Sequence, residues 1–288
     1  MLKRTLTALL LIPPVVYLIG WSPEWLFVLA VVAAMQLALR EYFALCRAMG
    51  YKAFPWICHV ASVALCVERA VPQHWSDFAV TLMLVALLVL LIPTLALRRS
   101  TELKDYLVDT SVTIFGILYI GLSLSCLVPI RFGFRPIAML SGHTAPVWDL
   151  SRGSALVLFL FLVIWAGDTC AYLVGRSVGR IPFFPRISPR KTWEGALAGL
   201  AASLLAAWAF THWFWKPADV KTVMLIAAWV AVAGQAGDLV ESAIKRGANH
   251  KDSGTLLPGH GGFLDRIDSL IFAAPALWLA LVVLGALP

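Results

Sequence analysis

The segment GDLVESAIKRGANHKDSGTLLPGHGGFLDRID, residues 237–268, is a polar interval in a chain that is otherwise strongly apolar. The chain has 288 residues, of which 60% are hydrophobic and 14% charged, and its mean hydropathy is +0.84. This composition predicts an integral membrane protein rather than a soluble domain. A membrane chain tolerates such a charged interval only where it faces a cavity or the aqueous boundary. We therefore expect the chemistry of the protein there.

Acidic and basic side chains are interspersed along this interval. The acids are Asp238, Glu241, Asp252, Asp265 and Asp268, and the bases are Lys245, Arg246, Lys251 and Arg266. On a helix, Asp238, Glu241 and Lys245 would share one face, because three and four residues separate them. Asp265 and Asp268 are three residues apart, so we expect them to project together from the start of a following helix.

The loop between these two groups, LPGHGG at residues 257–262, is too rich in glycine for a helix or a strand. Such a loop lets backbone N–H groups approach a phosphate closely. Carboxylates that converge without pairing suit a hard cation such as Mg²⁺, and bases nearby suit phosphate oxygens. The combination predicts phosphoryl or nucleotidyl transfer. The alternative is a solvated loop in which acids and bases neutralise one another.

Apolar segments of about the ~20 residues that span a bilayer recur along the chain. They cover residues 5–20, 25–40, 54–71, 77–97, 106–130, 154–175, 194–215, 220–242 and 268–287. We therefore predict an all-α, polytopic integral membrane protein with about nine transmembrane helices. It is expected to form one membrane-embedded domain over residues 1–288, with N-terminal helices at about 1–130 and a catalytic half at about 154–288.

The loop charges predict the orientation of these spans. With nine spans and an N-terminus inside, 17 of the 23 Lys and Arg residues fall in the inner loops, as the positive-inside rule requires. Both polar loops, 176–193 and 243–267, then face the cytoplasm, where nucleoside triphosphates are found. This topology accounts for the net charge of +7, so no nucleic-acid partner is expected.

Asp168 lies well inside the apolar segment 154–175. A carboxylate there costs roughly 2.5–3.5 kcal/mol on insertion scales, so it needs a partner or a function. We favour a place on the wall of a polar cavity. The alternative is a structural pair with a Lys or Arg of a neighbouring helix.

The pair Ser188-Pro189 resembles a helix start, with serine as the N-cap and proline at the first helical position. Arg190 and Lys191 would then fall in the first turn, where free N–H groups and two cations would form an anion site. Two solvated cations on the inner face are the alternative. His250 and His260 have no cysteine nearby, so they are interpreted as loop residues rather than zinc ligands.

Several runs resemble the signature of one enzyme family, the phosphatidate cytidylyltransferases or CDP-diacylglycerol synthases. These runs are SAIKR at 242–246, KDSG at 251–254, PGHGG at 258–262 and DRID at 265–268. SPRKTWEG at 188–195 and WAGDT at 165–169 are similar to further motifs of this family. Position 190 is often Lys in the family, and Arg190 keeps the charge. The motifs cover roughly the C-terminal half of the chain.

The resemblance implies an enzyme that converts CTP and phosphatidic acid to CDP-diacylglycerol and pyrophosphate within a bilayer, in a bacterial inner (plasma) membrane. It implies Mg²⁺ as cofactor, with a second cation for which K⁺ is a candidate, and a homodimer is a further expectation. The implied metal ligands are Asp238, Asp265 and Asp268, and the implied catalytic residues are these three with Lys245, Arg246 and Arg266. The implied substrate-binding residues are Asp168, Ser188, Arg190, Lys191, Thr192, Lys251, Asp252, Gly259, His260, Gly261 and Gly262. Which bases hold CTP and which hold the lipid phosphate stays open.

An ion-coupled transporter with buried acids is the alternative function. It would explain Asp168 and the apolar segments. It explains poorly a glycine loop at the membrane face and the lack of paired, broken half-helices in corresponding halves of the sequence. A transferase that consumes a CDP-alcohol would be expected to show a DG-x2-AR run before its later aspartates, and the sequence has none.

Overall fold

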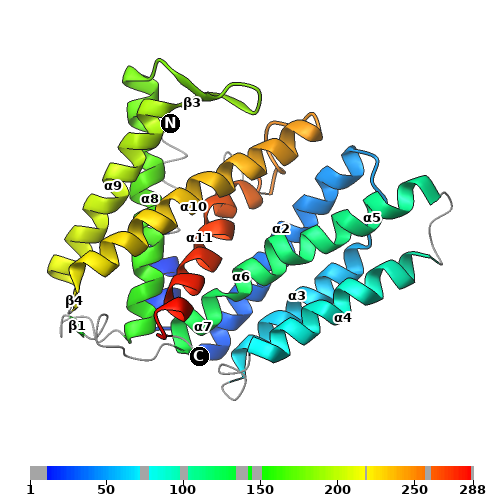
Figure 1. Ribbon diagram of the computed structural model, residues 1–288, viewed down its shortest axis with the longest axis horizontal. Coiled ribbons are helices and arrows are strands. Elements are labelled where there is room, and N and C mark those ends of the chain that lie inside the picture. The colour runs from blue at the N-terminus through cyan, green and yellow to red at the C-terminus, as the bar shows by residue number, and fades with distance from the viewer. Residues whose placement is uncertain are drawn as a thin grey trace.

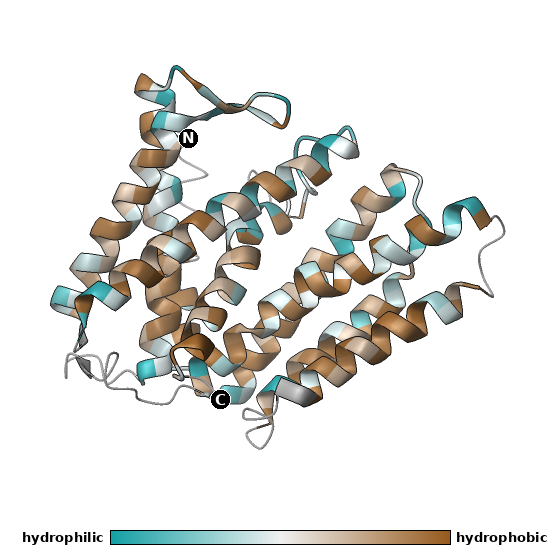
Figure 2. Ribbon diagram, viewed as in Figure 1, coloured by the Kyte–Doolittle hydropathy of each residue, from teal (hydrophilic) through white to brown (hydrophobic). Residues whose placement is uncertain are grey.

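Long helices form almost the whole of the structure, a computed structural model (Figure 1). It describes residues 12–71, 78–97, 103–133, 142–144, 151–217, 219–256 and 261–286. Of the first predicted segment, 5–20, residues 12–20 are described and helical. Most residues of the helices are apolar, and polar residues concentrate near the helix ends, as expected for membrane-spanning helices (Figure 2).

The N-terminal half contributes α2, α3, α4 and one long irregular helix. Their bounds are α2 Glu24–Ala48, α3 Pro55–Ala70, α4 Phe78–Ala96, α5 Leu103–Gly116, η2 Ile117–Leu122, α6 Ser123–Ser125 and α7 Leu127–Phe132. The last four follow one another with little interruption and form a single apolar helix, Leu103–Phe132, whose middle turn, η2, is π-helical.

The C-terminal half contributes four long helices and two small two-stranded sheets. Their bounds are β1 Gly142–Thr144, α8 Arg152–Val178, β2 Pro182–Phe184, β3 Ser188–Thr192, α9 Trp193–Trp213, β4 Trp215–Pro217, α10 Val220–Gly247 and α11 Leu264–Val283. Both sheets are antiparallel: β1 pairs with β4, and β2 pairs with β3.

Six of the described helices are long and apolar enough to cross a membrane. They are Glu24–Ala48, Leu103–Phe132, Arg152–Val178, Trp193–Trp213, Val220–Gly247 and Leu264–Val283. The helix α3 has 16 residues and carries His59 and Arg69, and the apolar run Val80–Ala96 in α4 is also shorter. The all-α membrane class is therefore confirmed, whereas the predicted count of about nine spans is not.

Glycines bring α8 and α9 close together. A Cβ on Gly199 would lie 2.9 Å from the carbonyl oxygen of Gly167, and one on Gly195 would lie 2.8 Å from the carbonyl oxygen of Ala171. In a bilayer, helices associate largely through such close packing, because lipid is as apolar as their side chains. This pair of helices forms one side of the cavity described below.

The prediction of a helix start at Ser188-Pro189 is wrong. Residues 188–192 form strand β3, in which Thr192 is opposite Pro182 and Ser188 is opposite Phe184. The helix begins at Trp193, and its N-cap is Thr192, whose Oγ1 accepts a hydrogen bond from the Gly195 amide at 3.2 Å. Pairing with β2 therefore overrides the local N-cap signal, and Arg190 and Lys191 stand before the helix instead of in its first turn.

The two polar loops lie at the same end of the molecule. The β2–β3 hairpin follows α8, and the segment after α10 leads back into α11 at this end, which the C-terminal end of α2 also reaches (Figure 1). The β1–β4 sheet lies at the opposite end. The common location of the two motif loops agrees with the sequence prediction that they share one face of the membrane.

Candidate active site

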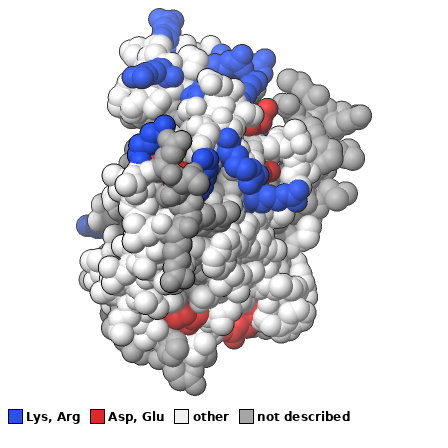
Figure 3. Space-filling model, turned by 90° about the vertical axis from the view of Figure 1, so that its right-hand side faces the viewer, with Lys and Arg blue, Asp and Glu red and all other residues white. Residues whose placement is uncertain are grey.

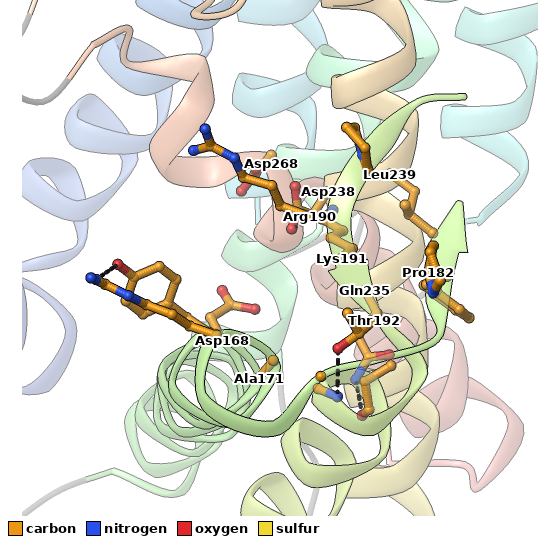
Figure 4. Close-up of a pocket in the computed structure, with 18 of the residues that line it drawn as sticks. Asp168, Ala171, Pro182, Arg190, Lys191, Thr192, Gln235, Asp238, Leu239 and Asp268 are labelled. Carbon is orange, nitrogen blue, oxygen red and sulfur yellow. Dashed lines mark hydrogen bonds and ion pairs between the residues drawn. The ribbon is translucent and has the colours of Figure 1, made fainter. Parts of the chain in front are cut away.

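A cavity of about 1000 Å³ opens between α8, α9, α10, the start of α11 and the β2–β3 hairpin (Figure 4). Its wall combines two kinds of charge. The acidic residues are Asp168, Asp238, Asp265 and Asp268, and the basic residues are Arg176, Arg180, Arg190 and Lys191. Lys and Arg also gather in the upper half of the face shown in Figure 3, the half that carries the hairpin. The cavity can therefore hold anionic and cationic groups side by side.

Three carboxylates come together beside this cavity, two of them, Asp238 and Asp268, on its wall. Asp238 and Glu241 lie one turn apart on α10, and Asp268 lies near the start of α11; one oxygen from each falls within 4.8 Å of the others. Gly237 permits this approach, because a Cβ there would lie 2.6 Å from the backbone oxygen of Asp268. Like charges this close repel, so the arrangement suits a bound cation.

Glu241 is the most buried member of this cluster, with 0% of its surface exposed. Lys245 lies in ion-pair contact with it, one helical turn along. Lys245 Nζ contacts its Oε2, whereas its Oε1 has no partner among the described residues. A buried carboxylate with unused acceptor capacity, next to two further acids, fits an oxygen-liganded ion such as Mg²⁺.

Asp265 lies beside the cluster, and both of its oxygens have donors. Its Oδ1 receives Lys245 Nζ at 2.5 Å, and its Oδ2 accepts the amides of Ser253 at 3.0 Å and Gly262 at 2.8 Å. Gly261 has φ +80°, a left-handed conformation that suits glycine and turns the chain toward α11. The structure thus connects Asp265 to the loop backbone and to Lys245, while Asp238, Glu241 and Asp268 converge.

The hairpin contributes two cations to the cavity. Lys191 Nζ lies 2.7 Å from Asp238 Oδ2, which links β3 to α10. In Figure 4, Arg190 and Lys191 extend from β3 into the space toward which the carboxyl groups of Asp168, Asp238 and Asp268 also point. These two cations can therefore contact an anion bound next to the acid cluster without any contribution from a helix N-terminus.

Asp168 lies on the cavity wall, as predicted. Its Oδ2 accepts a hydrogen bond from Ser269 Oγ at 3.3 Å, and no Lys or Arg among the described residues forms an ion pair with it. Its position in the middle of α8 is therefore explained by an opening to the cavity, whereas its role toward a substrate stays a prediction.

Other residues expected at the site do not line the cavity. Arg246 donates to the backbone oxygens of Ile187 and His250, at 3.3 and 3.0 Å, and so ties the end of α10 to the hairpin. Ser188 lies at the outer start of β3. Lys251, Asp252 and Arg266 are exposed. Gly259 and His260 lie outside the described residues.

Some residues at the site carry no signal in the sequence motifs. Arg176 and Arg180 line the cavity, and Tyr172 accepts a hydrogen bond from Arg176 at 3.0 Å. Glu41, from α2, contacts the polar loop directly. In the sequence, Glu41 could have been noticed as an acid well inside an apolar helix. The predicted segment ended at residue 40, however, and so placed Glu41 in a loop. Glu241 shares a helix face with Asp238, as its spacing predicts, but it was not among the expected metal ligands.

The fold and the site define a class: a helical membrane protein with a charged cavity suited to phosphate groups and a divalent cation. Comparison with known families makes this class specific. Residues 2–284 match the model of the cytidylyltransferase family. The match spans nearly the whole chain, so the protein belongs to this family.

Curated relatives share the similarity over most of their length. The chain is 34% identical to a phosphatidate cytidylyltransferase of Synechocystis sp. over 276 residues, 90% of this chain and 89% of the relative. It is 30% identical to a phosphatidate cytidylyltransferase of Staphylococcus haemolyticus, over 97% of this chain and 98% of the relative. A phosphatidate cytidylyltransferase of Bacillus subtilis is 44% identical over 129 residues, 45% of this chain and 48% of the relative.

Proposed function

We propose that this protein is a CTP:phosphatidate cytidylyltransferase that forms CDP-diacylglycerol and pyrophosphate. The observation that carries the proposal is the cavity, in which a cluster of acids faces a group of Arg and Lys side chains at one end of an apolar helical bundle. Membership of the cytidylyltransferase family supports the reaction type, and the names of the relatives support the lipid substrate. No feature of the cavity favours the transporter alternative.

The acid cluster is proposed to hold Mg²⁺ through Asp238, Glu241 and Asp268, whose oxygens converge. When bound, Mg²⁺ would offset the negative charge of the nucleotide phosphates. The ligand set expected from the sequence had Asp265 in place of Glu241. Asp265 accepts hydrogen bonds from Lys245 and from two backbone amides, so we propose that it holds the loop. Substitution of each acid distinguishes the ligand set with Glu241 from the one with Asp265. A second cation, with K⁺ as a candidate, stays a prediction.

The cations of the cavity are proposed to bind phosphate oxygens. Lys191 and Arg190 come from β3, and Arg176 and Arg180 come from the end of α8 and the residues after it, so cations approach from two elements. Guanidinium groups can bind two phosphate oxygens at once, and the Lys ammonium acts as a point charge. The triphosphate of CTP and the headgroup of phosphatidate both match this charge.

In the proposed reaction, an oxygen of the phosphatidate phosphate forms a bond to the α-phosphorus of CTP. The bond between that phosphorus and the oxygen bridging to the β-phosphate breaks, and pyrophosphate leaves with the bonding electron pair. The lipid phosphate is already largely ionised near pH 7, so the attack needs no strong base. The side chains therefore act by holding the two phosphates in line and by stabilising the charge that moves onto pyrophosphate.

The location of the site in the cell is also a proposal. Apolar helices and bacterial relatives support an integral membrane protein. We place it in the inner membrane with the cavity toward the cytoplasm, because CTP is found there and the basic loops are expected on that side. The homodimer stays a prediction that the size of the purified protein in detergent can test.

The deciding experiment is an assay of pyrophosphate release by the detergent-purified protein. Release should require CTP, phosphatidate and Mg²⁺ together, and CDP-diacylglycerol should form in equal amount. Replacing phosphatidate with diacylglycerol, which lacks the attacking phosphate, is the matched control. Pyrophosphate release that is independent of phosphatidate, or no release under any of these conditions, would refute the proposal.

A further inference from the structure

Glu41 is a buried acid of the N-terminal half that reaches the active-site loop. It lies on α2, is 7% exposed, and accepts three hydrogen bonds from residues more than 200 positions later in the chain. Its Oε1 accepts the Phe263 amide at 2.9 Å. Its Oε2 accepts the Leu264 amide and Ser253 Oγ, each at 2.8 Å. A buried carboxylate needs such donors, and these come from one short region.

These bonds satisfy the beginning of α11. The first amides of a helix have no partner within it, and the N-cap residue, Phe263, has no side chain that could accept them. Glu41 supplies the missing acceptor from another helix, and its negative charge is favourable at the positive end of the helix dipole. The position of α11 is therefore coupled to α2.

Two glycines of the loop leave room for this carboxylate. A Cβ on Gly254 would lie 2.5 Å from Glu41 Oε1, and a Cβ on Gly262 would lie 2.5 Å from Glu41 Oε2. Any larger residue at either position would displace the carboxylate or the loop. These contacts are independent of the hydrogen bonds, and they show that Gly254 and Gly262 both lie directly against Glu41.

A continuous set of contacts leads from Glu41 to the acid cluster. Ser253 Oγ, which donates to Glu41, accepts the Asp265 amide at 3.3 Å, and the Ser253 amide donates to Asp265 Oδ2. Asp265 in turn pairs with Lys245, which contacts Glu241. Asp268 lies one turn after Asp265 on the helix that Glu41 caps.

We propose that Glu41 is a positioning residue of the active site. By capping α11 and holding Ser253, it keeps Asp265 and Asp268 in place against Asp238 and Glu241 on α10. It acts on the cation and the phosphates only through these residues, and touches neither. The inference rests on the proposed function of the cavity, and it makes a residue of α2 part of the support of a site built by α8 to α11.

The test compares Glu41→Gln with Asp109→Asn in the full-length protein. Asp109 is a matched control, because it is also a buried acid, 5% exposed, that accepts a backbone amide, that of Lys52 at 2.7 Å, but it lies outside the site. Mutation of a residue that supports metal ligands typically lowers metal affinity or activity 10- to 100-fold. We expect Glu41→Gln to raise the Mg²⁺ concentration for half-maximal activity by about that factor, with partial recovery at high Mg²⁺, and Asp109→Asn to leave it unchanged.

Hydrogen exchange of the purified protein supplies a readout that does not need activity. Glu41→Gln should speed exchange in peptides covering the start of α11, without a similar change in α8 or α9. Wild-type exchange at α11 combined with a wild-type Mg²⁺ requirement would overturn the proposal, as would equal effects of Glu41→Gln and Asp109→Asn. If the wild-type protein lacks the cytidylyltransferase activity, the exchange experiment still tests the role of Glu41.

A second variant keeps the test valid if Glu41→Gln does not fold. Gly254→Ala leaves Glu41 in place but puts a methyl group against its Oε1. It should produce the same rise in the Mg²⁺ requirement and the same local increase in exchange. Gly254→Ala protein with wild-type values in both measurements would refute the positioning role.

Discussion

Lys245 lies between Glu241 and Asp265 and therefore influences which acids are available to a cation. Asp265 has both oxygens bonded, including two backbone amides, so its replacement affects the loop as well as the charge of the site. Glu241 lies near Asp238 and Asp268; its Oε2 contacts Lys245, and its Oε1 has no partner among the described residues. The two backbone amides that Asp265 accepts therefore distinguish it from Glu241, which we propose as a metal ligand.

The first prediction separates these two roles. Asp238→Asn, Glu241→Gln and Asp268→Asn should each lower turnover about 10²–10³-fold, the cost of losing one electrostatic contact of this kind, and should reduce the rise in unfolding temperature that Mg²⁺ causes. Asp265→Asn should retain the Mg²⁺-dependent rise but lower the unfolding temperature itself. Asp219→Asn, which keeps a capping side chain at the other end of α10, is the control. Loss of the Mg²⁺ effect in Asp265→Asn but not in Glu241→Gln would restore the ligand set expected from the sequence.

Lys191 gives the second prediction. Its pair with Asp238 is partly exposed, so it contributes little to stability, about 0–1 kcal/mol. A hydrogen bond from Lys191 to a bound phosphate would contribute more, about 1.5–3 kcal/mol, because both groups are charged. We therefore expect Lys191→Ala to lower kcat/KM roughly 10- to 100-fold with little change in unfolding temperature.

The control for this variant is Lys221→Ala, which removes an exposed lysine at the start of α10, far from the cavity. Steady-state kinetics with CTP and phosphatidate varied separately would also show which substrate Lys191 contacts. Wild-type kcat/KM for both substrates in Lys191→Ala would remove Lys191 from the site.

At the scale of elements, the contact of α8 with α9 forms one side of the cavity. The two helices carry residues of the site: Asp168 and Arg176 lie on α8, and the hairpin leads into α9. Gly199 and Gly195 let their backbones approach closely. We therefore expect packing here to affect the site even though neither glycine has a reactive side chain.

The third prediction tests this packing. Gly199→Val inserts a branched side chain where even a Cβ would lie 2.9 Å from the Gly167 carbonyl oxygen. Overpacking of this kind typically costs about 1–3 kcal/mol, so the unfolding temperature in detergent should fall. Ala201→Val introduces the same side chain on the exposed face of the same helix and should have a much smaller effect. Equal shifts in the two variants would show that the contact between α8 and α9 is not tight.

The hairpin also shows where local sequence signals fail. Ser188-Pro189 has the composition of a helix start, yet β2–β3 pairing places these residues in a strand and moves the start to Trp193. Thr192 performs the capping role that the sequence assigned to Ser188. The N-cap rule was applied to the wrong residue because strand pairing depends on partners that the local motif does not contain.

At the scale of the whole molecule, the sequence predicted the C-terminal helices well. The apolar segments 154–175 and 194–215 correspond closely to α8 and α9, because length and hydropathy alone define a membrane helix. The predicted segment 25–40 was too short, since α2 continues through Arg40, Glu41 and Arg47 to Ala48. These charges are compatible with a helix that leaves the apolar layer and meets the polar loop.

The candidate site was predictable in part. Asp238, Lys191, Asp265 and Asp268 line one cavity or its edge, and their motifs stand out in an apolar chain. The contact of Glu41 with Ser253 joins residues 212 positions apart. A single sequence contains periodicity and local spacing, but it does not contain such a long-range pairing. The supporting residues of a site are therefore harder to predict than its charged groups.

The orientation of the molecule gives the last prediction. The β2–β3 hairpin and the loop before α11 lie at one end, and the β1–β4 sheet lies at the other (Figure 1). The end with the two motif loops carries most of the basic side chains of the cavity, and the positive-inside rule places such an end in the cytoplasm.

A reporter inserted after Lys251 should therefore behave as cytoplasmic, and one inserted after Thr144 as external. A third reporter after Phe184 should agree with the one after Lys251, because the structure places both loops at the same end whatever the orientation. External reporters at both loops would reverse the orientation while preserving the fold. The reporters after Phe184 and Lys251 are separated by two crossings, α9 and α10, so they must lie on the same side of the membrane. If they lay on opposite sides, the helix arrangement itself would be wrong.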